Sequence, residues 1–160
     1  MTASPPTPGT ATAHPARKRA AAGILFTDPD GRILLVEPTY KNHWDLPGGV
    51  VDHGETLRQA AIRELDEELG VDWPVGRILV IDDLGSAVMV VFDGGVITDP
   101  IDVRLQASEL RSWTWCTPEQ AAELMAPAPI LTRRVHAAHR AQREGVTFYL
   151  ERGFITHAPT

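Results

Sequence analysis

Residues 57–69 constrain the fold more than any other part of the sequence, because both ends of a helix are specified there together with its buried side. Thr56 is a favourable N-cap residue, and Gln59 three positions later completes a capping box. Gly70 supplies the C-terminal stop. The apolar side chains recur once per turn and form one stripe, at Leu57, Ala61, Leu65 and Leu69. We therefore expect an amphipathic helix that packs one side on a core.

The same helix concentrates negative charge. Seven of the 21 acidic residues of the chain fall between Asp52 and Asp72. At about 100° per residue, Glu64, Glu67 and Glu68 lie within roughly one 100° arc. Like charges at this spacing destabilise a bare helix, and a hard cation such as Mg²⁺ or Mn²⁺ would turn that repulsion into ligation. A solvated acidic helix face is the alternative interpretation of these carboxylates.

Turn signals divide the rest of the chain into strands and two further helices. We expect strands at 21–26, 32–36, 77–81, 87–92 and 113–116, a weaker strand over 96–104, and helices over 118–125 and 130–144. Pro47, Gly48 and Gly49 are expected to interrupt regular structure. Because strands and helices mix without regular alternation, the pattern predicts an α/β fold in which helices pack against a mixed sheet.

Length and composition indicate one domain with a short tail. The chain has 160 residues, of which residues 1–18 are mostly Pro, Thr and Ala. Such a segment buries too little surface to offset its ordering entropy, so we expect a flexible tail over 1–18 and a folded domain over 19–160.

Charge and cysteine content exclude some function classes. The net charge of −6 argues against a stable nucleic-acid partner. No apolar run is long enough for a membrane span. Cys116 is the one cysteine, so no internal disulfide can form and the cytoplasm is the simplest compartment.

The segment from Gly49 to Val71 resembles the signature of the Nudix hydrolases, the MutT-like pyrophosphohydrolases. In that signature a glycine is followed at fixed distances by a glutamate, an Arg-Glu pair, a Glu-Glu pair and a second glycine. This sequence matches each fixed position, at Gly49, Glu55, Arg63, Glu64, Glu67, Glu68 and Gly70, and its aliphatic positions at Leu65 and Val71.

The resemblance implies a Nudix-type α/β/α sandwich with a mixed sheet. It also implies hydrolysis of a nucleoside diphosphate linked to another group, such as a nucleotide, an oxidised nucleotide or a nucleotide sugar. By the same resemblance Glu64, Glu67 and Glu68 are ligands of Mg²⁺ or Mn²⁺, with the Gly48 carbonyl as a further ligand. Glu55 and Arg63 are the pair that orients the loop and the helix.

Other residues are candidates for the remaining roles. The general base is either one of the motif glutamates or Glu109, which precedes the expected strand at 113–116. Lys41 could contact a phosphate, and Tyr40 or Trp44 could stack on a base. Surface exposure for Lys41, core packing for Trp44 and a solvated loop position for Glu109 are the alternatives.

Two further function classes remain open. A nucleotide sensor of the same fold would bind without turnover, although such a protein need not keep the glutamates of the motif. An isomerase of isoprenoid diphosphates would need a cysteine near the site. The basic last helix is expected to present a solvated face, or alternatively to meet another subunit in a homodimer.

Overall fold

The computed structural model describes residues 15–157, which form eight strands and three helices. Their order along the chain is β1 (Arg19–Thr27), β2 (Ile33–Pro38), β3 (Gly48–Val50), α1 (Leu57–Leu69), β4 (Ile78–Asp83), β5 (Ala87–Val96), β6 (Leu110–Cys116), α2 (Pro118–Leu124), α3 (Pro129–Glu144), β7 (Phe148–Glu151) and β8 (Phe154–His157). Most of the tail expected over 1–18 lies outside the described residues. None of the helices within residues 15–157 is long and apolar enough to cross a membrane.

The strands form one mixed sheet in the order β6-β2-β1-β5-β4-β7-β8, and β3 pairs with β1 beside this path. The pairs β1–β5 and β4–β7 are parallel, and the other pairs are antiparallel. One edge of β1 serves two partners, because its first half pairs with β3 and its end pairs with β2. The motif segment that contains β3 is therefore attached directly to the central strand.

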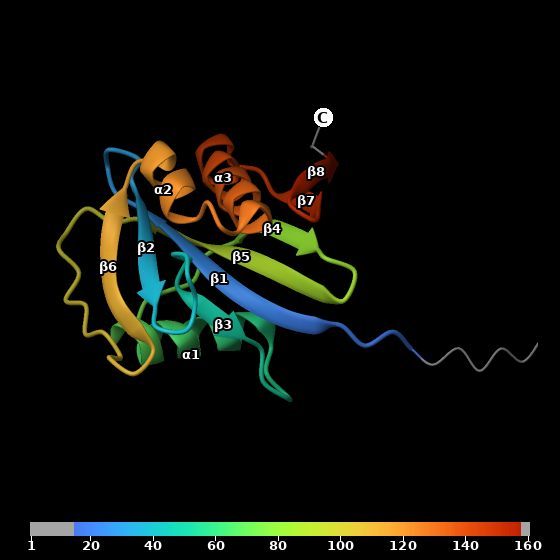
Figure 1. Cartoon of the computed structure of the whole chain (residues 1–160), viewed down its shortest axis with the longest axis horizontal. Helices are drawn as coiled ribbons and strands as arrows, with labels where there is room; N and C mark the ends of the chain where they lie inside the picture. Colours follow the sequence, from blue (N-terminus) through green and yellow to red (C-terminus); the bar gives the residue numbers. More distant parts are fainter. Residues whose placement is uncertain (1–14, 158–160) are drawn as a thin grey trace, which may run out of the picture.

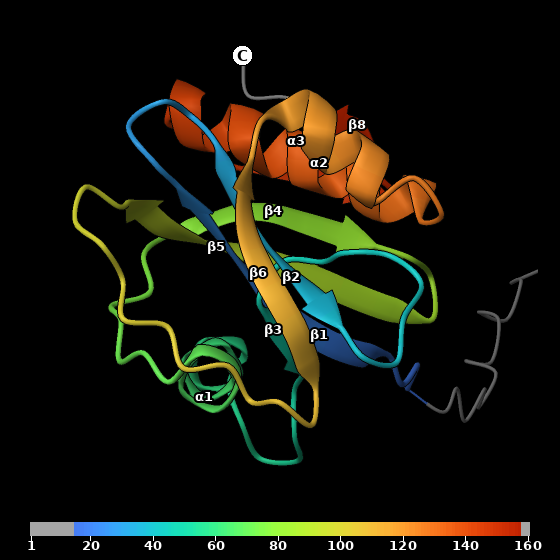
Figure 2. The same ribbon diagram turned by 60° about the vertical axis from the view of Figure 1, so that its left-hand side comes forward.

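Helices cover both faces of this sheet, as Figure 1 shows, with α1 on one side and α2 and α3 on the other. The turned view in Figure 2 shows the same separation. Leu65 and Leu69 of α1 pack with Ile24 and Phe92 in one core cluster, and Val135 of α3 belongs to the other cluster. The expected α/β/α sandwich with a mixed sheet is confirmed.

Helix α1 has the termini that the sequence predicts. The Thr56 hydroxyl accepts a hydrogen bond from the Gln59 backbone, and the Gln59 side chain accepts one from the Thr56 backbone. Gly70 ends the helix in the left-handed conformation, at φ 65°. Burial on one side of α1 includes Glu68, which is only 3% exposed although it is charged in its ordinary state.

The expected weak strand over 96–104 is wrong beyond Val96. Residues 97–109 form a loop without helix or strand. Ile97 N–H still donates to Thr27 O of β1, but two later backbone groups of the loop bond to the end of α1. Arg104 N–H donates to Leu69 O at 2.7 Å, and Gln106 N–H donates to Glu68 O at 3.1 Å. The loop thus caps the helix carbonyls that would otherwise lack partners.

Two strand features escaped the sequence analysis. The interruption expected at Pro47-Gly48-Gly49 is wrong, because the glycines start the short strand β3. A Cβ on Gly48 would lie 2.1 Å from Ala22 O, so the absence of a side chain is what permits this pairing. The hairpin of β7 and β8 was not predicted; it turns at Arg152 and Gly153, both at positive φ.

Replacing Gly48 by alanine should destabilise the whole fold. The residue has φ +140°, and the new methyl group would meet backbone atoms of β1, which cannot move aside without losing the strand pairing. We expect a loss of about 2 kcal/mol or more in the free energy of unfolding, measured by urea denaturation. A Gly54→Ala variant is the control, because Gly54 also has positive φ but open space around it; equal stability of the Gly48→Ala and wild-type proteins would contradict the packing argument.

Candidate active site

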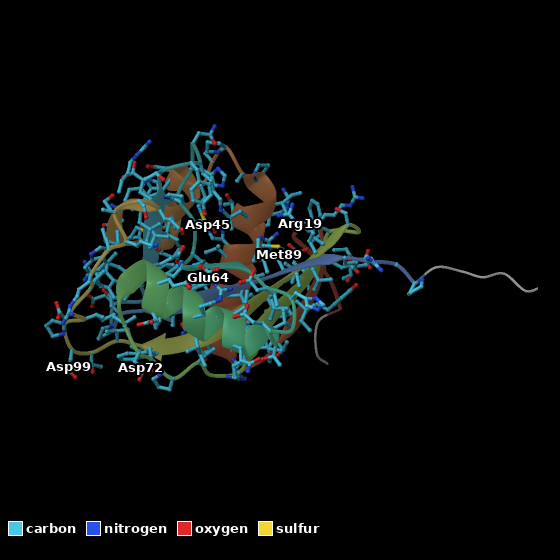
Figure 3. All side chains as sticks on the ribbon, turned by 90° about the horizontal axis from the view of Figure 1, so that it is seen from below. Arg19, Asp45, Glu64, Asp72, Met89 and Asp99 are labelled. Carbon is cyan, nitrogen blue, oxygen red and sulfur yellow. The ribbon has the colours of Figure 1, made fainter. Side chains whose placement is uncertain are left out.

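A cavity of about 600 Å³ opens over β3, β1 and β5. Glu64, Asp45 and Glu109 line it on the side of α1, and Met89 and Arg134 are among the residues that line it elsewhere. Figure 3 shows Glu64, Asp45, Met89 and Arg19 together, whereas the labelled Asp72 and Asp99 lie away from them. The floor is hollow because small residues face it, namely Ala21, Gly23 and Ala87. The site therefore combines carboxylates with room for a ligand larger than an ion.

Glu68 is buried directly behind the strand that forms the edge of this cavity. Its Oε2 accepts a hydrogen bond from the Gly48 N–H at 2.9 Å. Burial raises the pKa of Glu68 to about 8, the Gly48 N–H opposes that rise, and the nearby carboxylates of Glu64, Asp45 and Glu109 add to it. The hydrogen-bond donor to this carboxylate is thus a neutral backbone N–H, and Lys41, the cation whose pKa its charge helps to raise, is paired with Asp45.

Arg63 organises the exposed side of the same helix. Its Nε donates to Glu55 Oε1 at 2.7 Å and its Nη2 to Glu55 Oε2 at 3.0 Å. This bidentate pair lowers the pKa of Glu55 to about 2. Arg63 Nη1 also donates to Glu64 Oε1 at 2.8 Å and to Glu67 Oε2 at 3.0 Å. One guanidinium thus joins the loop before α1 to two of its glutamates.

The glutamates of α1 do not form a ready metal cage. Among residues 15–157, no three Asp, Glu, His or Cys side chains are grouped closely enough to hold one ion. The reason is visible in the hydrogen bonds, since Arg63 holds Glu64 and Glu67 while Glu68 faces Gly48. The donors nevertheless fit a hard cation, because they are all oxygen atoms and burial leaves Glu64 and Glu68 with raised pKa values.

Glu109 lies in the cavity wall together with Glu64. Two hydrogen bonds hold its backbone in place. Thr39 N–H donates to Glu109 O at 2.7 Å, and Glu109 N–H donates to Gln106 O at 2.9 Å. Its charge also contributes to the raised pKa of Glu64. The loop that caps α1 therefore delivers this carboxylate to the motif glutamates, although they are about forty residues apart in the sequence.

The residues before the glycines divide between cavity and core. Tyr40 is 65% exposed and lines the cavity together with Lys41. Trp44 is not among the lining residues, and it packs against the core cluster below α2 and α3. Core packing was the alternative to base stacking for Trp44, and it is the position that the structure shows.

Asp45 is a site residue that the sequence analysis missed. It lines the cavity, its Oδ2 pairs with Lys41 Nζ, and its charge helps to raise the pKa of Glu68. Burial lowers the pKa of Lys41, but the Asp45 carboxylate outweighs this and the net shift is upward. The spacing of Lys41 and Asp45, four residues apart, was the available signal, yet it predicts contact only in a helix and this segment is a loop.

The basic last helix is only partly the solvated face expected. His136, Arg140 and Arg143 are exposed, but Arg134 and His139 are buried at 6% and 8% exposure. The buried arginine pairs with Asp82 of β4. The charge pattern of the helix alone does not distinguish its buried basic residues from its exposed ones, because Asp82, the partner of Arg134, lies more than fifty residues away in the sequence.

Comparisons with known proteins place this site in a family. Residues 17–137 match the NUDIX domain. A CTP pyrophosphohydrolase of Escherichia coli is 34% identical over 119 residues, covering 71% of this chain and 88% of that protein. An RNA pyrophosphohydrolase of Novosphingobium aromaticivorans is 28% identical over 143 residues, covering 74% and 87%.

Solved structures agree with these matches. A MutT protein from Methanosarcina mazei superposes with a TM-score of 0.63 at 28% identity, covering 81% of this chain and 96% of that one. A Caenorhabditis elegans Ap4A hydrolase superposes with a TM-score of 0.59 at 27% identity, covering 79% and 96%. The family match spans most of the chain, including the helix that carries Glu64 and Glu68, and the chain therefore belongs to the Nudix family.

Proposed function

We propose that this chain is a divalent-metal-dependent pyrophosphohydrolase, which cleaves the diphosphate linkage of a nucleoside diphosphate joined to another group. Its membership of the Nudix family and its similarity to pyrophosphohydrolases indicate that it is a hydrolase acting on diphosphate bonds. The single observation that carries the finer proposal is the carboxylate pair of Glu64 and Glu68 beside a cavity of about 600 Å³. Two carboxylates partly withdrawn from water at the edge of a ligand-sized cavity suit a cation that binds phosphate.

The residues that would hold the cation are Glu64, Glu67 and Glu68, with the Gly48 carbonyl as a further ligand. Mg²⁺ or Mn²⁺ suits this all-oxygen set. When bound, such a cation neutralises phosphate oxygens and acidifies water for attack on phosphorus. Glu55 would keep Arg63 in place against the helix, as the bidentate pair does in this structure.

The proposed base is Glu109. It lies in the cavity wall, so a carboxylate at this position can orient the attacking water and accept its proton. A motif glutamate remains the alternative base, and Glu64 is the nearest one to the cavity. If Glu109 is the base, removal of its carboxylate lowers kcat strongly; if Glu64 is the base, removal of the Glu109 carboxylate has little effect on kcat.

The proposed substrate is a small nucleotide rather than a nucleic acid. The relatives include proteins named for CTP and for RNA, so the names alone do not choose. The cavity volume of about 600 Å³ suits a single nucleotide, with the phosphates near Lys41 and Glu64 and with Tyr40 beside the sugar or base. We place this activity in the cytoplasm, where such nucleotides are abundant.

The alternatives are disfavoured by particular residues. An isomerase would need a thiol at the site, but Cys116 is buried between β6 and β2, where its thiol donates to Ile33 O. Burial raises the pKa of Cys116 to about 11, so it is a poor nucleophile. A sensor without turnover would not require the buried Glu68, whose desolvation carries a free-energy penalty.

Turnover should require a divalent cation and the Glu68 carboxylate. A panel of nucleoside triphosphates and nucleotide sugars, with release of phosphate or pyrophosphate as the readout, should show hydrolysis with Mg²⁺ and none with EDTA. Glu68→Gln should lower kcat/KM, and the fall should correspond to a loss of several kcal/mol of transition-state stabilisation. The variant keeps an oxygen acceptor for the Gly48 N–H, so its melting temperature should be equal or slightly higher.

The matched control for this variant is Asp66→Asn, which removes one charge from the exposed side of the same helix. It should turn over like the wild type. Undiminished turnover by a folded Glu68→Gln protein would contradict the ligand assignment. Absence of turnover on every compound in the panel would contradict the proposed function itself.

Glu109→Gln should lower kcat far more than it raises KM. Help from a general base is typically worth 10²–10⁴-fold, or about 3–5 kcal/mol of the barrier. The exchange should not change the melting temperature, because the backbone contacts of Glu109 rather than its side chain hold the loop. A loss of less than about threefold in kcat would return the role of base to Glu64.

Gly49→Ala should separate activity from stability. A methyl group there would lie 2.3 Å from Glu64 Oε1, the flexible end of a side chain, so Glu64 must turn aside while the backbone stays. We expect a melting temperature within about 3 °C of the wild type and a kcat/KM reduced about 100-fold, since a small displacement of a catalytic group has an effect of this size. Wild-type turnover in this variant would show that the position of Glu64 is not critical.

A further inference from the structure

The part of the cavity under α3 is built differently from the part beside α1. Its walls are apolar, formed by Leu84, Met89 and Leu131, and Arg134 is the buried charged side chain among them. Arg19 also lines the cavity, but its side chain is exposed to solvent. An apolar wall with one convergent polar group is typical of a site that reads an aromatic ring system, and it is a poor environment for a phosphate.

Arg134 is held firmly by the sheet beneath it. Its Nε donates to Asp82 Oδ2 at 2.8 Å, and the side chain of Asp82 is fully buried. The other oxygen of Asp82 accepts a hydrogen bond from Gly153 N–H at 3.0 Å. Both carboxylate oxygens are therefore occupied, and the guanidinium has a fixed orientation. Within residues 15–157, the Nη1 and Nη2 groups of Arg134 donate to no protein acceptor.

The strand register places this arginine at the far side of the cavity from the glutamates. Asp82 of β4 lies opposite Met89 of β5, Met89 lies opposite Ala21 of β1, and Ala21 lies opposite Val50 of β3. These four residues form one row across four strands, which spans about 14 Å at the usual strand spacing. A nucleotide with its phosphates beside Glu64 therefore extends its base toward Arg134.

We propose that Arg134 determines base specificity and selects nucleotides whose base presents two adjacent hydrogen-bond acceptors. The two free Nη groups form a fork of parallel N–H donors. Cytosine offers N3 and O2 to such a fork, and guanine offers O6 and N7. Adenine places an amino group beside N1 and N7, and uracil places an N–H between its carbonyls, so each meets the fork with at most one acceptor. This inference rests on the proposed nucleotide substrate.

The test uses ligands that carry the base but no diphosphate. Binding of CMP, GMP, UMP, AMP and ribose 5-phosphate to the full chain is measured by calorimetry with Mg²⁺ present. The wild type should bind CMP and GMP at least about 5-fold more tightly than UMP and AMP, since this is the lower end of the discrimination that a bidentate contact to a base provides. Arg134→Lys keeps a positive charge beside Asp82 but loses the fork, so it should remove this preference and leave ribose 5-phosphate binding unchanged.

Arg133→Lys is the control, because the Arg133 guanidinium packs over the Phe154 ring outside the cavity. Its binding preference should equal that of the wild type. If Arg134→Lys does not fold, Ala87→Leu replaces it: the larger side chain takes up part of the cavity that Ala87 and Arg134 both line, and CMP and GMP should then bind no better than ribose 5-phosphate.

Three results would overturn the inference. These are equal affinity of the wild type for the four mononucleotides, an unchanged preference in folded Arg134→Lys or in Ala87→Leu, and equal weakening of ribose 5-phosphate and CMP in Arg134→Lys. The last result would mean that Arg134 binds phosphate. Failure of the proposed hydrolysis is a separate result, because mononucleotides contain no diphosphate linkage and report only on binding.

Discussion

A carboxylate buried beside a strand backbone is the constraint on which the site depends. Glu68 is 3% exposed, and the Gly48 N–H is its hydrogen-bond donor. That contact exists only because β3 lies against β1, and β3 can lie there only because Gly48 has no side chain. The fold thus accepts an unfavourably buried acid next to the cavity. We interpret this as an arrangement completed by a cation, which would restore the ordinary ionised state of the carboxylate.

The two faces of the sheet serve different parts of the substrate in this account. Helix α1 supplies the acidic groups on one side, and α3 supplies a fixed guanidinium on the other. The central strand joins them, since β1 carries the small residues over which the cavity opens. Such a division would let the chemistry stay constant while the residues under α3 set which base is accepted.

Local signals were sufficient to predict most of the fold. The capping box, the glycine stop and the apolar stripe predicted α1 with its observed ends, and the turn residues predicted most of the strands. The failures arose where a distant segment satisfied the backbone. Arg104 and Gln106 in the loop over 97–109 bond to the end of α1 instead of joining the sheet. Gly48 pairs with β1 in a strand, and the close approach is possible because glycine has no side chain. The sequence carries no local signal for either contact.

The candidate site shows the same limit. Fixed spacing identified the motif glutamates and the Glu55–Arg63 pair, because these residues act within about fifteen positions of one another. The buried Asp82–Arg134 pair was not found, since its two residues come from a strand and a helix far apart in the sequence. Asp45 was missed although its partner Lys41 is only four residues away, because this segment is a loop and the spacing predicts contact only in a helix. For Trp44 the sequence left base stacking and core packing open, and the structure places its side chain against the core.

Binding of Mn²⁺, followed by electron paramagnetic resonance of the free ion, shows whether the buried Glu68 carboxylate helps to hold a cation. We expect the wild type to bind Mn²⁺ and excess Mg²⁺ to displace it. Glu68→Gln should weaken the binding at least 10-fold, and Asp66→Asn should not. Equal Mn²⁺ binding by the wild-type and Glu68→Gln proteins would contradict this expectation, because the buried carboxylate would then have no part in holding a cation.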